Sequence, residues 1–148
     1  MTKETDRDIM DAFEAKCKSK GLKITPQRVA IFKALIESAN THPTAEMIYS
    51  NVRADMPNIS YNTVNTTLTA YKDIGIIDIV ETKGLPKRFD PITAHHHHFK
   101  CLRCNSLIDI YNDVCDILPV PKELCDREFE IVNKKILWEG FCKDCSRG

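Results

Sequence analysis

Four consecutive histidines, His95–His98, are followed three residues later by the first of two C-x-x-C pairs, Cys101/Cys104. The second pair is Cys142/Cys145. Imidazoles and thiolates are the side chains that most often bind transition metals in proteins. A histidine run can be a purification tag, but this one is internal and four residues long. The first question about this sequence is therefore which of these residues bind metal, and which ion they bind.

The paired cysteines predict a closed, structural zinc site. Two such pairs hold tetrahedral zinc when each turns tightly around the ion and the chain between them folds back. The alternative is four unrelated cysteines. The other three, Cys17, Cys115 and Cys125, are expected to pack as small apolar side chains or to stay free. The charged N-terminal segment has no apolar signal sequence, so we expect a cytoplasmic protein whose thiols stay reduced.

The histidines predict a second site of a different kind. Alternate side chains of a strand share a face, so His96 and His98 should point one way, and His95 and His97 the other. Either pair could give two imidazoles to one ion. The other candidate ligands are His42, Asp90 and Asp109. Imidazole and carboxylate without thiolate suit Fe(II), Mn(II) or Zn(II). The alternative is a solvated histidine-rich loop that binds metal adventitiously.

Helical periodicity and capping signals dominate the first part of the chain. Helices are predicted over residues 6–20, 26–38, 45–55 and 61–74. Their boundaries carry capping or stop residues, namely Gly21, Thr25, Thr44, Ser60 and Gly75. Two strands around a Gly-Leu-Pro-Lys loop follow within residues 76–90. Helices followed by a hairpin are typical of a winged helix-turn-helix, although a generic α+β domain with a solvent-facing helix has the same order.

The composition changes after Pro91, where histidines and cysteines precede strands expected over residues 106–111 and 129–141. Pro119 and Pro121 should break the segment between these strands. Such a short unit has a small core, for which a structural metal and dimerisation are the usual remedies. We therefore predict an α+β protein with a winged-helix DNA-binding domain at 1–88 and a metal-binding α/β dimerisation domain at 89–148.

Charge gives little evidence for a polyanion partner, because the net charge is zero. A local cluster differs: Lys16–Arg28 holds five basic residues and no acidic one, although a solvated helix end would look the same. The predicted DNA contacts are Lys16, Lys20, Lys23, Arg28, Tyr61, Asn62, Thr63, Asn65, Thr66, Lys87 and Arg88. No apolar run is long enough to cross a bilayer, so no membrane partner is expected.

The segments ITPQR, THPTAEMIY, NISYNTVNTTL, KRFD, HHHHFKCLRC and CKDC occur in an order that resembles the ferric uptake regulator family. The resemblance implies a homodimeric metalloregulator that binds a double-stranded DNA operator. Its structural Zn(II) would be held by Cys101, Cys104, Cys142 and Cys145. A regulatory Fe(II) or Mn(II) would be held by His42, Asp90, His96, His98 and Asp109.

Asp109 makes the chain most similar to the peroxide-responsive branch, because iron-sensing members of the family resemble one another in having glutamate there. The resemblance implies that Fe(II) reduces hydrogen peroxide, that His42 and His96 are oxidised to 2-oxo-histidine, and that the repressor then leaves DNA. The alternative is a reversible iron- or zinc-responsive uptake regulator. A metalloenzyme is not expected, because no general base or nucleophile is evident. A zinc-stapled protein-interaction module would be distinguished by a salt-dependent DNA titration.

Three departures from the family pattern matter, and one is that Pro119 and Pro121 break the region of the family's dimerisation helix, which looks short here. The recognition helix usually reads A-T-V-Y, and here it reads NTVN, with Asn62 and Asn65 in place of alanine and tyrosine. Asparagine can bind adenine through two hydrogen bonds, so DNA binding is retained while the operator sequence is open. Lys134 stands where many members have a histidine of a third metal site, and we therefore predict no such site here.

Overall fold

Local capping interactions begin the helices of the first part of the chain. The side chains of Thr25, Thr44 and Ser60 each accept a hydrogen bond from the backbone N–H three residues on. The helices are α1 (Asp6–Ser19), α2 (Pro26–Glu37), the 3₁₀ turn η1 (Ala39–Thr41), α3 (Ala45–Asp55) and α4 (Tyr61–Asp73). The predicted helices are confirmed. Gly21 and Gly75, with φ of +71° and +78°, follow α1 and α4 as expected.

The computed structural model describes residues 5–81, 83–91 and 94–147. It divides into two compact units, Met1–Thr93 and Ala94–Gly148. The predicted boundary, after Arg88, lies five residues before the boundary between these units and falls inside the strand Arg88–Asp90. The roles assigned to the two domains stay predictions. Within these described ranges, no helix is both long and apolar enough to cross a bilayer.

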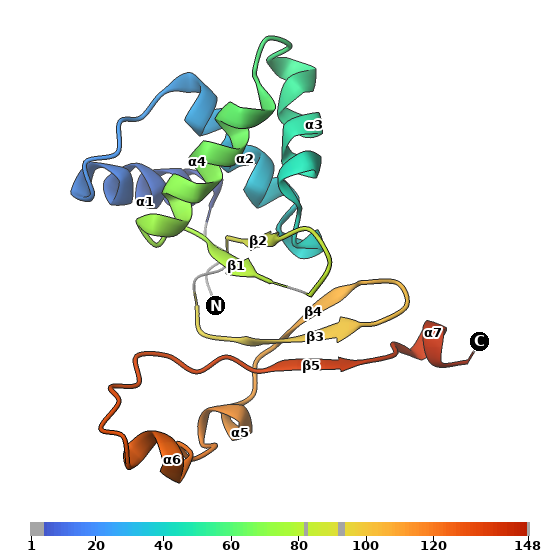
Figure 1. The fold of residues 1–148 in the computed structure, drawn as a ribbon. Helices are drawn as coiled ribbons and strands as arrows, with labels where there is room; N and C mark the ends of the chain where they lie inside the picture. Colours follow the sequence, from blue (N-terminus) through green and yellow to red (C-terminus); the bar gives the residue numbers. More distant parts are fainter. Residues whose placement is uncertain (1–4, 82, 92–93, 148) are drawn as a thin grey trace. The chain divides into compact units, whose positions relative to one another are not determined.

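Unit 1 is a helical bundle followed by a two-stranded wing. Strands β1 (Asp78–Val80) and β2 (Arg88–Asp90) pair antiparallel directly after α4, as Figure 1 shows. The ring of Phe13 stacks on that of Phe32 at 4.1 Å, and both meet the edge of Tyr71. Val64 and Leu68 of α4 are fully buried in the same core. The order of elements is that of a winged helix-turn-helix, with α4 in the recognition position.

Tyr71 also makes a polar contact that should contribute to the stability of unit 1. Its hydroxyl donates to the carbonyl oxygen of Arg28 at 2.6 Å. The Tyr71→Phe variant would remove this hydrogen bond, so the unfolding free energy should fall by about 1 kcal/mol. Urea denaturation would measure this. Tyr61→Phe, which changes an exposed tyrosine, is the control and should cause no loss.

Unit 2 is a small mixed sheet with short helices at its ends. Its elements are β3 (His97–Cys101), β4 (Leu107–Ile110), α5 (Asp113–Asp116), α6 (Lys122–Cys125), β5 (Leu137–Gly140) and α7 (Lys143–Ser146). The strand order is β4-β3-β5, with β3 antiparallel to β4 and parallel to β5. In Figure 1, α5 and α6 lie toward one end of this sheet and α7 at the other. The α+β architecture is therefore as predicted.

One predicted strand is wrong in extent. We expected a strand over residues 129–141, but β5 begins only at Leu137. The preceding apolar residues are exposed, with Val132 at 87%. Ile136 still accepts the N–H of His98 in β3. In the part of unit 2 that the structure describes, no strand pairs with residues 129–135, so these β-prone residues lack a partner edge. The segment broken by the two prolines forms the short helices α5 and α6, as expected.

Candidate metal centres and nucleic-acid interface

The four paired cysteines come together at one end of the unit 2 sheet. Cys101 and Cys104 lie at the turn between β3 and β4, where Asn105 adopts a left-handed φ of 59°. Cys142 directly precedes α7, and Cys145 lies within it. The four sulfur atoms lie within 4.8 Å of one another. Zn–S bonds of about 2.3 Å in a tetrahedron put sulfurs about 3.8 Å apart, and Cys104 Sγ lies 3.9 Å from Cys142 Sγ. The residues fit a structural zinc ion.

Hydrogen bonds support negative charge at this cluster. The backbone N–H of Cys142 donates to Cys101 Sγ at 3.4 Å, and this bond is the main reason why the pKa of Cys101 falls to about 6. The neighbouring Cys142 thiol instead raises the pKa of Cys145 to about 12. Four thiolates at this separation would repel one another strongly unless a cation lay among them. The four cysteines therefore fit a bound divalent ion.

Three of the predicted regulatory ligands converge within unit 2. Asp109 of β4 pairs with His98 of β3, which puts both side chains on one face of the sheet. Asp109 Oδ1 lies 3.4 Å from His98 Nε2 and 3.5 Å from His96 Nε2, and the two imidazole nitrogens are 3.1 Å apart. Ligand atoms about 2.1 Å from one ion are separated by about 3.0–3.4 Å. These three residues therefore fit one face of a metal coordination shell.

The hydrogen bond on the other ring nitrogen of His96 suits ligation. His96 Nδ1 lies 2.6 Å from the carbonyl oxygen of Ala94, which can only accept, so Nδ1 carries the proton. The Nε2 lone pair of the neutral ring then points toward Asp109 and His98. Metal-binding histidines are commonly oriented in this way by a backbone carbonyl.

The other two predicted ligands lie together in unit 1. His42 Nε2 is 3.8 Å from Asp90 Oδ2, and both side chains are buried. His42 has a left-handed backbone, with φ of 48°, which is uncommon for a residue with a side chain. Arg88 holds this turn by donating to the carbonyl oxygens of Thr41 and His42. The Phe89 N–H adds a bond of 2.9 Å to the Pro43 carbonyl. Strand β2 thus supplies Asp90 and fixes the loop that carries His42.

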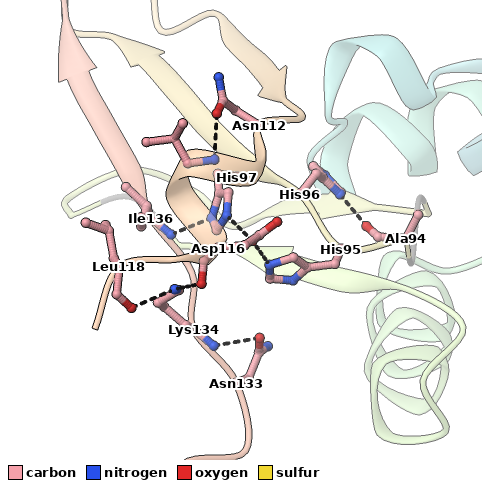
Figure 2. Close-up of polar contacts among 11 residues, drawn as sticks. Ala94, His95, His96, His97, Asn112, Asp116, Leu118, Asn133, Lys134 and Ile136 are labelled. Carbon is pink, nitrogen blue, oxygen red and sulfur yellow. Dashed lines mark hydrogen bonds and ion pairs between the residues drawn. The ribbon is translucent and has the colours of Figure 1, made fainter. Parts of the chain in front are cut away.

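A third cluster lies on the opposite face of β3. His95 Nε2 and His97 Nε2 lie 2.7 Å and 3.0 Å from the same oxygen, Asp116 Oδ1 (Figure 2). Hydrogen bonds from His97 and then His95 lower the pKa of Asp116. The sequence predicted the direction of both histidines but not their partner. Nothing in the local sequence singles out Asp116, which reaches them because the chain reverses after β4.

The hydrogen bonding of His97 argues against a metal ion in this cluster. Its Nδ1 accepts the backbone N–H of Ile136 at 3.1 Å, so the proton of the neutral ring is on Nε2 and points at Asp116 (Figure 2). A metal bound at Nε2 would require the proton of the ring to be on Nδ1. Two N–H donors, those of Nδ1 and of the Ile136 backbone, would then face each other. Lys134 Nζ donates to the carbonyl oxygens of Asp116 and Leu118, which ties the same region together without metal.

We therefore expect the His95→Ala variant to retain the metal content of the wild type, because its imidazole belongs to a hydrogen-bonded cluster. His98→Ala, a matched change on the other face of β3, should lose the regulatory ion and keep zinc. Elemental analysis after anaerobic loading with Mn(II) and Zn(II) would measure both. Metal loss from the His95 variant would contradict the assignment.

The predicted DNA contacts lie on unit 1, in α1, the loop that follows it, α2, α4 and the wing. Tyr61, Asn62, Asn65 and Thr66 are exposed along α4, and Thr63 is partly buried at its first turn. Lys16, Lys20, Lys23 and Lys87 are exposed. The two arginines are engaged within the unit: Arg28 donates to the Lys23 carbonyl, and Arg88 to the His42 turn. Their role as DNA contacts stays a prediction.

Comparisons with known proteins show the family to which the chain is similar. Residues 19–138 match the model of the ferric uptake regulator family. The chain is 37% identical to the peroxide-responsive repressor PerR of Staphylococcus saprophyticus over 129 residues, 86% of this chain and 85% of that one. It is 36% identical to PerR of Staphylococcus aureus over 132 residues, covering 88% and 87%.

Solved structures show the same fold. The ferric uptake regulator of Helicobacter pylori, described with three functional metal binding sites, superposes with a TM-score of 0.77 at 23% identity, covering 99% of this chain and 97% of that one. PerR from Streptococcus pyogenes, described in terms of peroxide sensing and gene regulation, gives a TM-score of 0.51 at 26% identity, covering 93% and 92%.

Proposed function

Because this chain belongs to the ferric uptake regulator family of metal-responsive transcriptional regulators, we propose that it is a DNA-binding repressor that senses peroxide through oxidation of its own histidine ligands. The observation that carries this proposal is the position of Asp109, whose short carboxylate lies 3.4–3.5 Å from both imidazoles of the His96/His98 pair. The similarity to PerR proteins supports the same conclusion.

We assign His42, Asp90, His96, His98 and Asp109 to a single regulatory ion. The ligand atoms of His96, His98 and Asp109 lie 3.1–3.5 Å apart, and the buried His42 and Asp90 lie 3.8 Å apart. Neither set contains a thiolate. Such donors suit Fe(II) or Mn(II). Their assignment to one ion rests on the resemblance of the sequence, since the geometry supports each set separately.

When bound, Fe(II) would supply the reducing power that cleaves the O–O bond of hydrogen peroxide. The net change at the chain is the insertion of one oxygen atom into an imidazole C–H bond, while the second oxygen leaves as water. His42 and His96 are the expected targets. An oxidised ring changes its donor properties, so the site would lose affinity for the ion, and the repressor would leave DNA.

Peptide mass spectrometry tests this proposal directly. The protein is loaded with Fe(II) without oxygen and given stoichiometric hydrogen peroxide, with Mn(II)-loaded protein as the control. One added oxygen at His42 or His96 in the Fe(II) sample alone is the expected result. Unmodified histidines in a sample shown to hold Fe(II) would instead identify a reversible metal-responsive regulator.

DNA binding is proposed for unit 1 because its order of helices and wing is that of a winged helix-turn-helix. Affinity for duplex DNA should fall steeply as salt rises, since phosphate contacts release counterions. A protein-interaction module would show no such dependence. Lys87, 62% exposed and paired with Glu81 at 3.6 Å, is our main candidate in the wing.

Charge reversal in the wing should weaken DNA binding without changing base preference. For Lys87→Glu we expect lower affinity for every duplex and a salt slope reduced by about one or more. Fluorescence anisotropy at several salt concentrations would measure both. Lys122→Glu in α6 of unit 2 is the matched control. Equal affinity of the Lys87 variant and the wild type would remove the wing from the interface.

A homodimer is proposed because unit 2 leaves many large apolar side chains exposed. They include Tyr111, Val114, Ile117, Phe129, Val132 and Trp138. A soluble monomer rarely shows so much apolar surface on so small a unit. Sedimentation equilibrium should give twice the mass of one chain, and a monomer at micromolar concentration would contradict the proposal.

A further inference from the structure

The exposed face of α4 carries hydroxyl and amide side chains that are engaged very differently. Thr66 Oγ1 donates to the carbonyl oxygens of Asn62 and Thr63 at 2.9 Å and 3.2 Å. Thr69 Oγ1 donates to the Asn65 carbonyl at 3.0 Å. Thr63 Oγ1 lies 2.8 Å from the Oγ of the N-cap Ser60. The threonine hydroxyls are therefore committed to the helix backbone or its cap.

The two asparagines on this face are not committed in this way. Asn62 and Asn65 are exposed, and in the described part of unit 1 neither amide side chain has a hydrogen-bond partner. They are three residues apart, so their amides lie one above the other on the same side of the helix. Each amide offers one donor and one acceptor side by side, which matches the N6 and N7 atoms of adenine in the major groove.

Their surroundings suit an approach to DNA. Both lie in the first turns of α4, the part of a recognition helix that meets base edges. No acidic residue lies in the first turn of α4. The ring of Tyr61 stands edge-on to that of Tyr49 at 5.7 Å, and the Arg53 guanidinium lies 5.8 Å from the Tyr49 ring centre. The Arg53 cation thus lies one aromatic ring away from Tyr61, the first residue of α4.

We propose that Asn62 and Asn65 are the two base-reading residues of this protein, each binding the major-groove edge of an adenine in the same half-site. The hydroxyls of Thr63 and Thr66 stay engaged with the N-cap Ser60 and the helix backbone. This inference rests on the proposed DNA-binding function of unit 1. It assigns specificity to two amides among the polar residues of α4.

Selection of bound duplexes from a randomised DNA library, using Mn(II)-loaded protein, would test the assignment. Wild-type protein should select half-sites with adenine at two fixed positions. Asn62→Ala should relax the preference at one position and Asn65→Ala at the other, each by roughly 5- to 150-fold in relative affinity. Thr69→Val is the matched control. Its hydroxyl donates to the Asn65 carbonyl within the helix, so the selected sequences should not change.

The outcomes separate this inference from the function on which it rests. If both asparagine variants keep salt-dependent binding and the wild-type base preferences, the reading role is wrong while the repressor proposal stands. A relaxed preference in Thr69→Val would also overturn the assignment, because that hydroxyl would then be reading a base. Absence of salt-dependent binding by the wild type would overturn the proposed function itself.

Discussion

Replacing Cys101 with serine should remove zinc from the protein and unfold unit 2. Cys101 is fully buried at the turn between β3 and β4. Its sulfur accepts a hydrogen bond from the backbone N–H of Cys142, which is distant in sequence but adjacent in space. Structural zinc contributes on the order of 10 kcal/mol to the folding of small zinc domains, and whole small domains are stable by only about 5–15 kcal/mol. The apolar core of unit 2 is too small to compensate for that loss.

Zinc content and hydrogen exchange would measure this effect. The Cys101→Ser variant should contain no zinc, and amides of β3, β4 and β5 should exchange freely, while the helices of unit 1 keep their protection. Cys125→Ser is the matched control, because Cys125 is exposed and lies outside the four-cysteine cluster. Retention of zinc and of protected strands in the Cys101 variant would show that the cluster is not a structural metal site.

Lengthening Asp109 by one methylene should separate peroxide sensing from metal-dependent DNA binding. The Asp109→Glu variant keeps a carboxylate beside His96 and His98, so a Mn(II)-loaded protein should bind DNA within a few-fold of the wild type. The carboxylate would move along the face of the sheet, and a displacement of about 1 Å can slow a reaction on the order of 100-fold. Oxygen incorporation at His42 or His96 should fall accordingly.

A second carboxylate offers an internal control for this experiment. Asp116 also contacts two imidazoles, His95 and His97, but on the other face of β3. Asp116→Glu should leave histidine oxidation unchanged. Peptide mass spectrometry on the three proteins, after identical doses of peroxide, gives the comparison. Equal oxidation in the wild type and the Asp109 variant would mean that the length of this side chain does not determine the response.

Sequence reasoning was accurate where the determining interactions are local. Thr25, Thr44 and Ser60 cap helices by bonding to N–H groups three residues away, so a few residues suffice to place each start. The alternation of the four histidines follows from strand geometry alone. The separation of the cysteines into two pairs likewise needs only the known spacing of zinc ligands.

The features that were missed depend on contacts distant in sequence. Asp116 meets His95 and His97 because α5 follows β4 around the end of the sheet, and no short-range pattern encodes that reversal. The strand expected over residues 129–141 forms only at Leu137–Gly140, because a strand needs a partner edge as well as β-prone residues. Arg88 resembles a phosphate contact in sequence, yet its guanidinium bonds to the turn that carries His42.

The histidine run has a consequence for the order of assembly. A strand that slips by one residue turns each side chain to the opposite face, and ordinary sequences resist this because the wrong residues become buried. In His95–His98 a slipped register would still present imidazoles on both faces, so these four residues cannot set their own alignment. The zinc turn at Cys101–Cys104, at the other end of the same strand, can do so. Zinc should therefore bind during folding and before the regulatory ion, since metal captured earlier by the histidines would trap a misaligned strand.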